Sequence, residues 1–417
     1  MRSRRWLGVI AVAAVGVLTA CSSSGDDGGG GGGSDNTTSS ASSGGGTTYK
    51  IGVMFDQTGL AAGTYATTSE KGVKAAFAAV NKEMPNGAKL TYVTADTQST
   101  PAGALSAAQS LVQREHVFAI LPLTSAFFGA AAYLTQQKVP VVGPGIDGPE
   151  WLEQKNTNLF NTFGEYDQAA STTAYGDFMK AQGVTTCGSI GSSNIPSVTA
   201  AADGFLAACK AAGLKVAPVN STIPYGGTDI GAIALQLKAA GIDGFVSSQS
   251  NNTSYALVAR LKQLGVNLKV TLIAIGYGSD TLDSPSTVKA AQGLGFQPEG
   301  APIELDTPGA QKLKAALEAG GITGPPTYPE QTAYGAAQAF LAGFKAAGKD
   351  NISQQEFMTA LRGVKDFDAA GVYAPAKIDF SKYGVASLGG CIWPVKLVDD
   401  KFVPYDNIPF CGDAIKS

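Results

Sequence analysis

Two hydroxyl side chains, Thr124 and Ser125, stand directly after the apolar run 117–123. The run is too short for a helix, and its unbroken apolar character is typical of a strand buried on both faces. Hydroxyl residues at this point can cap the next helix, whose first N–H groups have no partner inside the helix. Such a helix start favours an anion or a carboxylate oxygen. We therefore predict that Leu123, Thr124 and Ser125 belong to a small-molecule site, although capping alone would also account for the hydroxyls.

Other chemistry has little support in the sequence. His116 is the single histidine, so neither a histidine-dependent nucleophile nor a histidine-rich metal site is indicated. The loop 55–59 follows the first predicted strand but lacks the glycine spacing that cradles a dinucleotide pyrophosphate. The net charge is −3 without a long basic run, which speaks against nucleic acid as a partner. We expect a binding protein without metal or cofactor, and not an enzyme.

Alternating strands and helices would position these residues. With 417 residues the chain is longer than one hydrophobic core usually organises. Strands are predicted at 49–55, 90–95, 117–121 and 139–142, and after a break near 163–168 at 186–190, 215–219, 244–247 and 271–275. Helices are predicted between them, including 200–212, 231–240 and 255–264, and later at 309–319, 329–347 and 353–361. Short strands are predicted at 377–380 and 392–398. The alternation predicts an α/β protein with parallel sheets in two lobes.

The first residues form a targeting segment. Arg2, Arg4 and Arg5 precede an apolar stretch at 6–18, after which small residues lead into Cys21. This segment resembles a bacterial lipoprotein signal peptide, which implies removal of residues 1–20 and lipid on Cys21. An ordinary secretory signal or an anchoring helix is the alternative, but the stretch is short for a membrane span. We expect an exported protein anchored by lipid to the outer face of the cytoplasmic membrane.

Residues 21–48 begin with the lipidated cysteine and are otherwise nearly all Ser, Gly, Thr, Asp and Asn. Such a composition buries too little apolar surface to fold, so we predict a disordered tether.

Four cysteines remain beyond Cys21, and an even number in an exported chain is compatible with disulfides. Cys187 lies on a predicted strand and Cys209 on the next helix, while Cys391 and Cys411 bracket a C-terminal hairpin. Proximity therefore predicts the pairs Cys187–Cys209 and Cys391–Cys411, although other pairings stay open on the sequence alone. A four-cysteine zinc site is the rival, but it would favour a CxxC spacing that is absent here.

Several segments together match a known pattern: 49–59 (YKIGVMFDQTG), the helix at 71–81, 119–125 (AILPLTS), 139–144 (VPVVGP) and 332–338 (TAYGAAQ). In their order and spacing they resemble ABC-transporter substrate-binding proteins of the branched-chain amino acid type. The resemblance implies a type I periplasmic-binding fold, with two Rossmann-like lobes, three crossings and a ligand cleft. It places lobe one at 49–163 plus about 299–367, and lobe two at 164–298 plus about 368–417.

The resemblance also implies which residues contact the ligand. In lobe one they are Tyr65, Leu123, Thr124, Ser125, Gly145 and Asp147, with residues 123–125 holding a carboxylate. In lobe two they are Glu165, Tyr166, Asn194, Asn251, Asn252, Tyr277 and Asp280. The loop 276–278 lacks the acid that usually meets the ligand ammonium, and a buried ammonium without a partner is costly. An amino acid ligand would therefore need Asp280, Glu165 or Asp147 as a substitute; otherwise a carboxylate, amide, polyol or aromatic compound fits as well as leucine.

These features predict a monomeric solute-binding lipoprotein that captures an amino acid-like, carboxylate, amide or aromatic molecule and delivers it to ABC permease subunits. Ligand contacts from both lobes would stabilise the closed form over the open one. A sensor that signals to a membrane partner through the same closure is the first alternative, and a cleft enzyme is the second.

Overall fold

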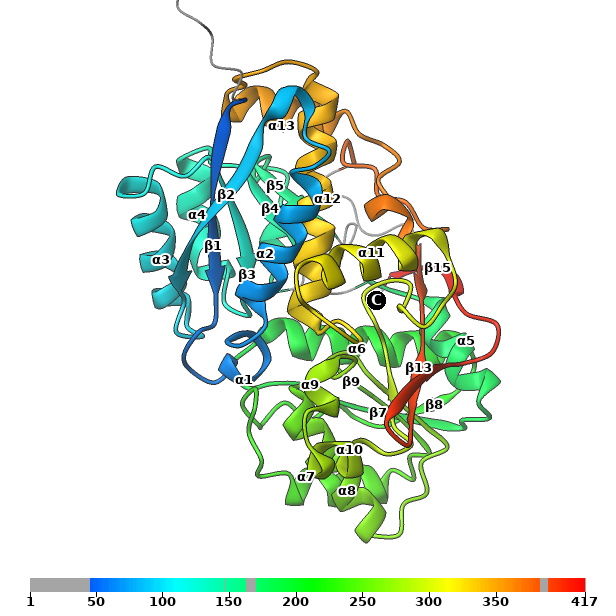
Figure 1. The fold of residues 1–417 in the computed structure, drawn as a ribbon. Coiled ribbons are helices and arrows are strands. Elements are labelled where there is room, and N and C mark those ends of the chain that lie inside the picture. Colours follow the sequence, from blue (N-terminus) through cyan, green and yellow to red (C-terminus); the bar gives the residue numbers. More distant parts are fainter. Residues whose placement is uncertain (1–45, 146, 163–169, 383–388, 417) are drawn as a thin grey trace, which may run out of the picture. The chain divides into compact units, whose positions relative to one another are not determined.

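The predicted alternation of strands and helices is present from residue 48 onward in the computed structural model (Figure 1). The structure describes residues 46–145, 147–162, 170–382 and 389–416. The predicted signal peptide and almost all of the predicted tether lie outside these ranges, as do Glu165 and Tyr166. Residues Gly44–Ser417 form one compact unit.

A five-stranded parallel sheet lies in the first part of this unit, with the order β2-β1-β3-β4-β5. Its strands are β1 (Thr48–Phe55), β2 (Lys89–Asp96), β3 (Ala119–Leu123), β4 (Val141–Gly143) and β5 (Leu159–Asn161). Helices α1 (Ala62–Tyr65), α2 (Ser69–Val80), α3 (Pro101–Gln113) and α4 (Phe128–Gln136) lie between the strands. Every residue of β3 is buried, as its continuous apolar run predicted.

One face of this sheet is covered by a helix from much later in the chain. Helix α12 (Tyr328–Ala347) packs beside α2 and against β3 and β4, and α13 (Gln354–Arg362) packs on α12 (Figure 1). Residues of α12 and α13 share one apolar cluster with β1 and α2. A capping box at Thr327 and Glu330 starts α12, with the Thr327 N–H donating to Glu330 Oε2 at 2.7 Å.

A seven-stranded sheet follows in the order β14-β13-β11-β10-β9-β7-β8. Its strands are β7 (Thr186–Ile190), β8 (Lys215–Val216), β9 (Gly244–Ser247), β10 (Val270–Ile273), β11 (Gly295–Phe296), β13 (Val395–Val398) and β14 (Lys401–Pro404). The associated helices are α5 (Thr173–Ala181), α6 (Pro196–Ala211), α7 (Gly231–Ala239), α8 (Asn251–Gln263), α9 (Ser279–Leu282) and α10 (Pro285–Ala291). Helix α11 (Pro308–Ala319) packs against α2 beside the first sheet. Strands β7 to β11 are parallel, and β13 and β14 join antiparallel. The predicted α/β class with parallel sheets is confirmed.

The C-terminal strands correct two predictions. The expected strand at 392–398 is two strands in different sheets, because β12 (Gly389–Ile392) pairs with β15 (Phe410–Lys416) while β13 pairs with β11. The break contains Pro394, which has no N–H to offer a ladder. The expected strand at 377–380 is wrong, since only Ile378 forms a bridge, to Phe367. A third sheet has the order β12-β15-β6, with β6 at Ala170–Thr172.

Both predicted disulfides are present. Cys187 on β7 bonds to Cys209 on α6, with the Cα atoms 6.5 Å apart. Cys391 and Cys411 stand directly opposite one another on β12 and β15 and are also bonded. The first bond joins a strand to its crossover helix, and the second closes the C-terminal sheet.

Within the described part of the chain, no helix combines the length and the apolar character that crossing a lipid bilayer requires.

Candidate functional site

Polar side chains gather where the strands of the first sheet end. Asp56 follows β1, Thr97 follows β2, Thr124 and Ser125 follow β3, and Asp147 lies in the loop after β4. Because these strands are parallel neighbours, their carboxyl ends meet at one edge of the sheet. The fold thereby brings three of the predicted site residues together with two that the sequence reasoning missed.

The carboxylate of Asp56 lies in the hydroxyl turn after β3. Asp56 is fully buried, and its Oδ2 accepts hydrogen bonds from the N–H of Ser125 at 3.0 Å and from Ser125 Oγ at 2.9 Å. Its Oδ1 accepts from Thr124 Oγ1 at 2.5 Å and from Thr97 Oγ1. The carboxylate in this turn therefore belongs to the chain itself, whereas the sequence predicted a ligand carboxylate here.

The helix start also differs from the expectation. Thr124 and Ser125 do not cap α4, because residues 124–127 form a turn and the helix begins only at Phe128. The N–H of Phe128 donates to Asp147 Oδ2 at 2.8 Å, and Trp151 Nε1 donates to Asp147 Oδ1 at 2.8 Å. A carboxylate close to a helix start is favourable, because it satisfies free N–H groups and complements the helix dipole.

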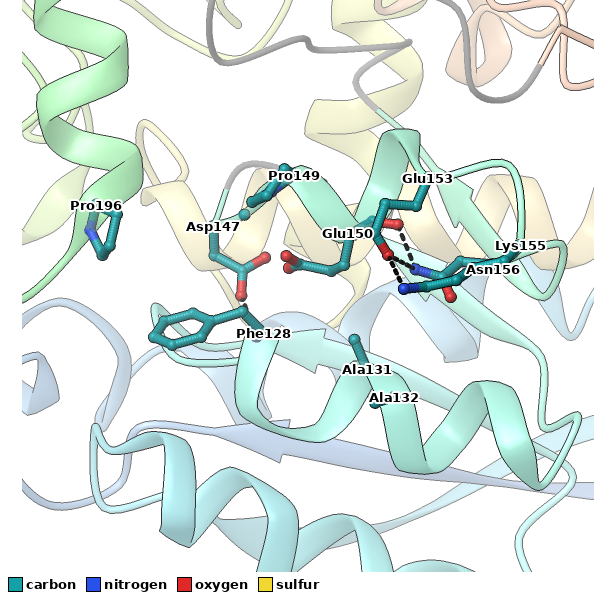
Figure 2. A pocket seen from close by; sticks show the side chains of 11 residues that line it. Phe128, Ala131, Ala132, Asp147, Pro149, Glu150, Glu153, Lys155, Asn156 and Pro196 are labelled. Atoms are coloured by element: carbon teal, nitrogen blue, oxygen red, sulfur yellow. Dashed lines mark hydrogen bonds and ion pairs between the residues drawn. The ribbon is translucent and has the colours of Figure 1, made fainter.

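A pocket of about 360 Å³ opens beside Asp147. It is lined by Phe128, Ala131, Ala132, Asp147, Gly148, Pro149, Glu150, Glu153, Lys155, Asn156 and Pro196. Most of these residues belong to α4 and to the segment around the 3₁₀ helix η2 (Pro149–Leu152), whereas Pro196 is the first residue of α6 beside the second sheet. Figure 2 shows the carboxyl groups of Asp147 and Glu150 pointing toward one another at this pocket.

The two carboxyl groups differ in their hydrogen bonding. Asp147 has the two donors described above, but Glu150 Oε1 is buried without a hydrogen-bond partner, and Glu150 is only 7% exposed. Burial raises the pKa of Asp147 to about 7. Burial, and then the charge of Asp147, raise the pKa of Glu150 to about 9. At neutral pH the empty pair therefore holds at least one proton.

Three tyrosines from separate parts of the chain are buried near this edge. Tyr65 ends α1, Tyr328 begins α12, and Tyr225 lies in the loop after β8. The Tyr65 and Tyr328 rings meet edge to face with their centroids 6.0 Å apart, and the Tyr225 hydroxyl bonds to Thr64. Burial raises the pKa of all three hydroxyls. Tyr65 was predicted; Tyr225 and Tyr328 were missed, although a turn sequence and a capping box mark their positions.

The predicted asparagines beside the second sheet have local roles. Asn194 Oδ1 accepts from the Tyr225 N–H at 2.8 Å and from Ser192 Oγ at 2.8 Å, so it orients the Tyr225 loop. Asn251 and Asn252 are the first residues of α8 and not a free loop, and Asn252 is exposed. The fully buried Gln249 was missed: its Nε2 donates to the Gly191 carbonyl at 2.9 Å, and its Oε1 accepts from the Gly226 N–H at 3.3 Å.

The predicted residues after β10 lie in two different environments. Tyr277 is buried against Phe402, and its hydroxyl donates to Glu304 Oε2 at 2.7 Å and accepts from the N–H of Ile303 at 3.1 Å. Asp280 lies in the first turn of α9; its Oδ1 is buried without a hydrogen-bond partner, and burial raises its pKa.

Glu299 was missed by the sequence reasoning. Desolvation raises its pKa to about 8, and its charge raises the pKa of Tyr328, so its carboxyl lies within electrostatic reach of the tyrosine group.

The remaining predicted residues of the first sheet shape the backbone. Leu123 is buried in the core at the end of β3. The Gly145 N–H donates to Asn161 Oδ1 at 2.8 Å, and a Cβ at residue 145 would meet Asn161 Cγ at 2.5 Å. Glycine is therefore needed where this loop approaches β5. Among the described residues, no group of three or more His, Cys, Asp or Glu side chains is placed to hold a metal ion.

Two parallel α/β sheets with a polar site at the strand ends are the architecture of proteins that bind a small solute between α/β lobes. A family model for periplasmic binding proteins matches residues 48–401, and the chain belongs to this family. Its members bind solutes and are not enzymes, so this protein is a binding protein.

Solved structures of the same fold include a solute-binding protein of an ABC transporter from R. palustris in complex with 4-hydroxybenzoate. It is 19% identical, with 89% of this chain and 97% of that chain covered and a TM-score of 0.66. A second R. palustris protein, in complex with benzoate, is 15% identical with 89% and 98% covered and a TM-score of 0.69. A leucine-binding protein from Thermotoga maritima is 17% identical with 88% and 99% covered and a TM-score of 0.66. At these identities the similarity shows the fold. No curated protein matches the sequence significantly.

Proposed function

We propose that this protein captures a small organic solute in the pocket beside Asp147, called the strand-end pocket below, and delivers it to the permease of an ABC transporter. The observation that supports the proposal best is the composition of the pocket wall. Helix α4 and the Asp147 loop come from the first sheet, while Pro196 comes from α6 beside the second sheet. A solute that contacts both walls would stabilise the closed arrangement of two lobes over an open one.

Contacts around the pocket support the same mechanism. Tyr225 and Ile195, from segments of the second sheet, belong to one apolar cluster with Tyr65 and Tyr328. The Tyr225 hydroxyl reaches Thr64 across this junction. Since these contacts link segments more than a hundred residues apart, opening the junction would separate the two pocket walls and release a bound solute.

The pocket is tested by filling it. Ala132 is an exposed residue of α4 that lines the pocket, and Ala315 is an exposed residue of α11 that does not. The purified full-length protein in mild detergent is screened by thermal shift against amino acids, carboxylic acids, amides, polyols, amines and aromatic compounds, because a ligand of the native state raises the Tm. Hits are measured by calorimetry. Ala132→Trp is expected to abolish binding while Ala315→Trp preserves it; equal affinities in both variants would contradict the proposed site.

Delivery to a permease is tested in the host. Deleting the gene should abolish high-affinity uptake of the solute identified by screening, and restoring the gene should restore uptake. Unchanged uptake would refute the transport role while leaving solute binding intact.

We also propose that the mature protein is a monomer held at the outer face of the cytoplasmic membrane by lipid on Cys21. The sequence pattern around Cys21 supports the lipid anchor. Cys21→Ala should release the protein from the membrane fraction, and metabolic labelling with a fatty acid should then be lost.

A further inference from the structure

The charged groups buried around the strand-end pocket are acids. In the described part of the chain, the buried charged side chains are Asp56, Asp147, Glu150 and Glu330. The basic group of the pocket wall is Lys155, which lies 3.0 Å from Glu153 and is 73% exposed. The interior side of the pocket therefore presents negative charge, or the protons that neutralise it, to whatever enters.

Glu150 has unused capacity to accept a hydrogen bond. Its Oε1 is buried at the pocket without a hydrogen-bond partner, and its carboxyl points toward that of Asp147 (Figure 2). Two buried carboxyl groups that face each other cannot both ionise cheaply, because like charges repel in a poorly solvated site. A positive group placed between them removes this penalty and gives Oε1 a donor.

The rest of the wall is suited to an organic molecule. Phe128, Ala131, Ala132, Pro149 and Pro196 provide carbon surface around the two carboxyl groups. The Phe127 and Trp151 rings lie against each other nearby, with their centroids 5.0 Å apart. A bare metal ion fits less well, since among the described residues no group of three or more His, Cys, Asp or Glu side chains is placed to hold one.

We propose that the pocket recognises the protonated amine of a small organic solute, with the carboxyl groups of Asp147 and Glu150 as its acceptors. This inference rests on the proposed solute-binding function and specifies the class of ligand. Asp56 already fills the neighbouring hydroxyl turn, so a ligand carboxylate has no seat there.

The proton balance follows from the raised pKa values of the two facing carboxyl groups. When the ammonium group enters at neutral pH, the proton held by the empty pair leaves to solvent and both carboxyl groups become ionised. Other charged or titratable groups act on the pair: Asp56 raises the pKa of Asp147, Glu153 raises that of Glu150, and the Tyr65 and Tyr328 hydroxyls stay neutral near Asp147. Affinity for an amine should therefore rise with pH, by at most about tenfold per pH unit for each proton released.

Two matched series test the inference on the full-length protein. One is benzylamine, benzamide and benzoate, and the other is isopentylamine, isovaleramide and isovalerate, so that charge changes while the carbon skeleton is nearly constant. Calorimetry between pH 6.0 and 8.5, in buffers of different ionisation enthalpy, measures both affinity and proton release. The amine of at least one series should bind most tightly, release a proton and bind better at higher pH.

Two variants test whether the carboxyl pair, and not any change of a carboxyl group, decides the affinity for an amine. Glu150→Gln should weaken amine binding by about 30-fold or more, as expected when one partner of a buried charge pair is truncated. Glu318→Gln, at an exposed position of α11 outside the pocket, should change it less than about threefold.

Three results would overturn the inference: tighter binding of a neutral or anionic member in both series, an affinity of Glu150→Gln within twofold of the parent, or no binding of either amine at millimolar concentration. If a neutral or anionic compound binds at the pocket, the solute-binding function stands and only the ligand class is wrong. If the broad thermal-shift screen also yields no ligand, the proposed function itself fails.

Discussion

Removing the Asp56 carboxylate should destabilise the protein and leave an anion-binding site in its place. In Asp56→Ala, the Ser125 N–H and the hydroxyl groups of Thr97, Thr124 and Ser125 lose their shared acceptor. Four hydrogen bonds to a charged acceptor are worth roughly 1.5 kcal/mol each at the low end. The substitution also removes the cost of burying the charge, so we expect a net loss of about 4 kcal/mol.

This loss translates into a moderate shift in Tm. The entropy of unfolding is about 2.1 cal/mol/K per residue, which gives roughly 0.8 kcal/mol/K for the compact unit Gly44–Ser417. A loss of about 4 kcal/mol then lowers the Tm by roughly 5 °C. Scanning calorimetry measures the shift, and Asp203→Asn, at an exposed position of α6, is the control that should change the Tm by less than about 1 °C.

Formate should restore part of the lost stability, because it can occupy the seat that Asp56 vacates. With a Kd of about 10 mM, 200 mM formate would return about 1.8 kcal/mol, or roughly 2 °C, through binding to the native state. Chloride at equal ionic strength should not reproduce the effect, and formate should not raise the Tm of the parent protein. The reasoning is refuted if Asp56→Ala melts within 1 °C of the parent, or if formate and chloride act equally on the variant.

Further predictions concern titration and the disulfides. Burial opposes ionisation of Asp243, but hydrogen bonds from the Thr186 N–H, Lys269 and Thr185 lower its pKa to about 2. Asp243→Asn should therefore lower the Tm at pH 7, and the difference in Tm from the parent should shrink as the pH falls from about 4 toward 2. Glu150 has the opposite pH dependence, because its raised pKa means that the stability present at pH 4 is lost as the pH rises toward about 9. Glu150→Gln should therefore raise the Tm relative to the parent most at pH 8 to 9. An equal shift in Tm at pH 5 would contradict the assigned pKa. Replacing both Cys187 and Cys209 by Ala removes a crosslink with a separation of 22 residues and should cost about 3 kcal/mol, measured by calorimetry against the parent with and without reductant.

Much of the fold could be predicted from local pattern. The predicted bounds 186–190 and 244–247 match those of β7 and β9, and every residue of both strands is buried, although both contain hydroxyl residues and glycine. The wrong strand predictions lie where pairing between distant segments decides whether a strand forms and which sheet it joins. Ile378 forms a single bridge where a strand was expected, and the run at 392–398 divides at Pro394 because its two parts join different sheets.

The candidate site was less predictable than the fold. Thr124, Ser125 and Asp147 could be chosen because each follows a predicted strand, and parallel strand ends meet at one edge. Asp56 also follows a strand, yet nothing in its neighbours shows that its carboxylate bends into the β3 turn. Tyr225 and Tyr328 come from loops far apart in the chain, so their meeting with Tyr65 depends on how the sheets and α12 pack.

The sequence by itself determined the α/β class, the parallel strands and the edge of the sheet where polar groups collect. These features follow from hydrophobic periodicity and from residue types within short segments. Only the tertiary structure decided the charge of the site. It placed Asp56 in the seat predicted for a ligand carboxylate, and it left Glu150 facing Asp147 with an unused oxygen. The physical reason is that the preference of a pocket for anion or cation depends on which donors and acceptors are already satisfied inside the protein, and that is settled by contacts between distant segments.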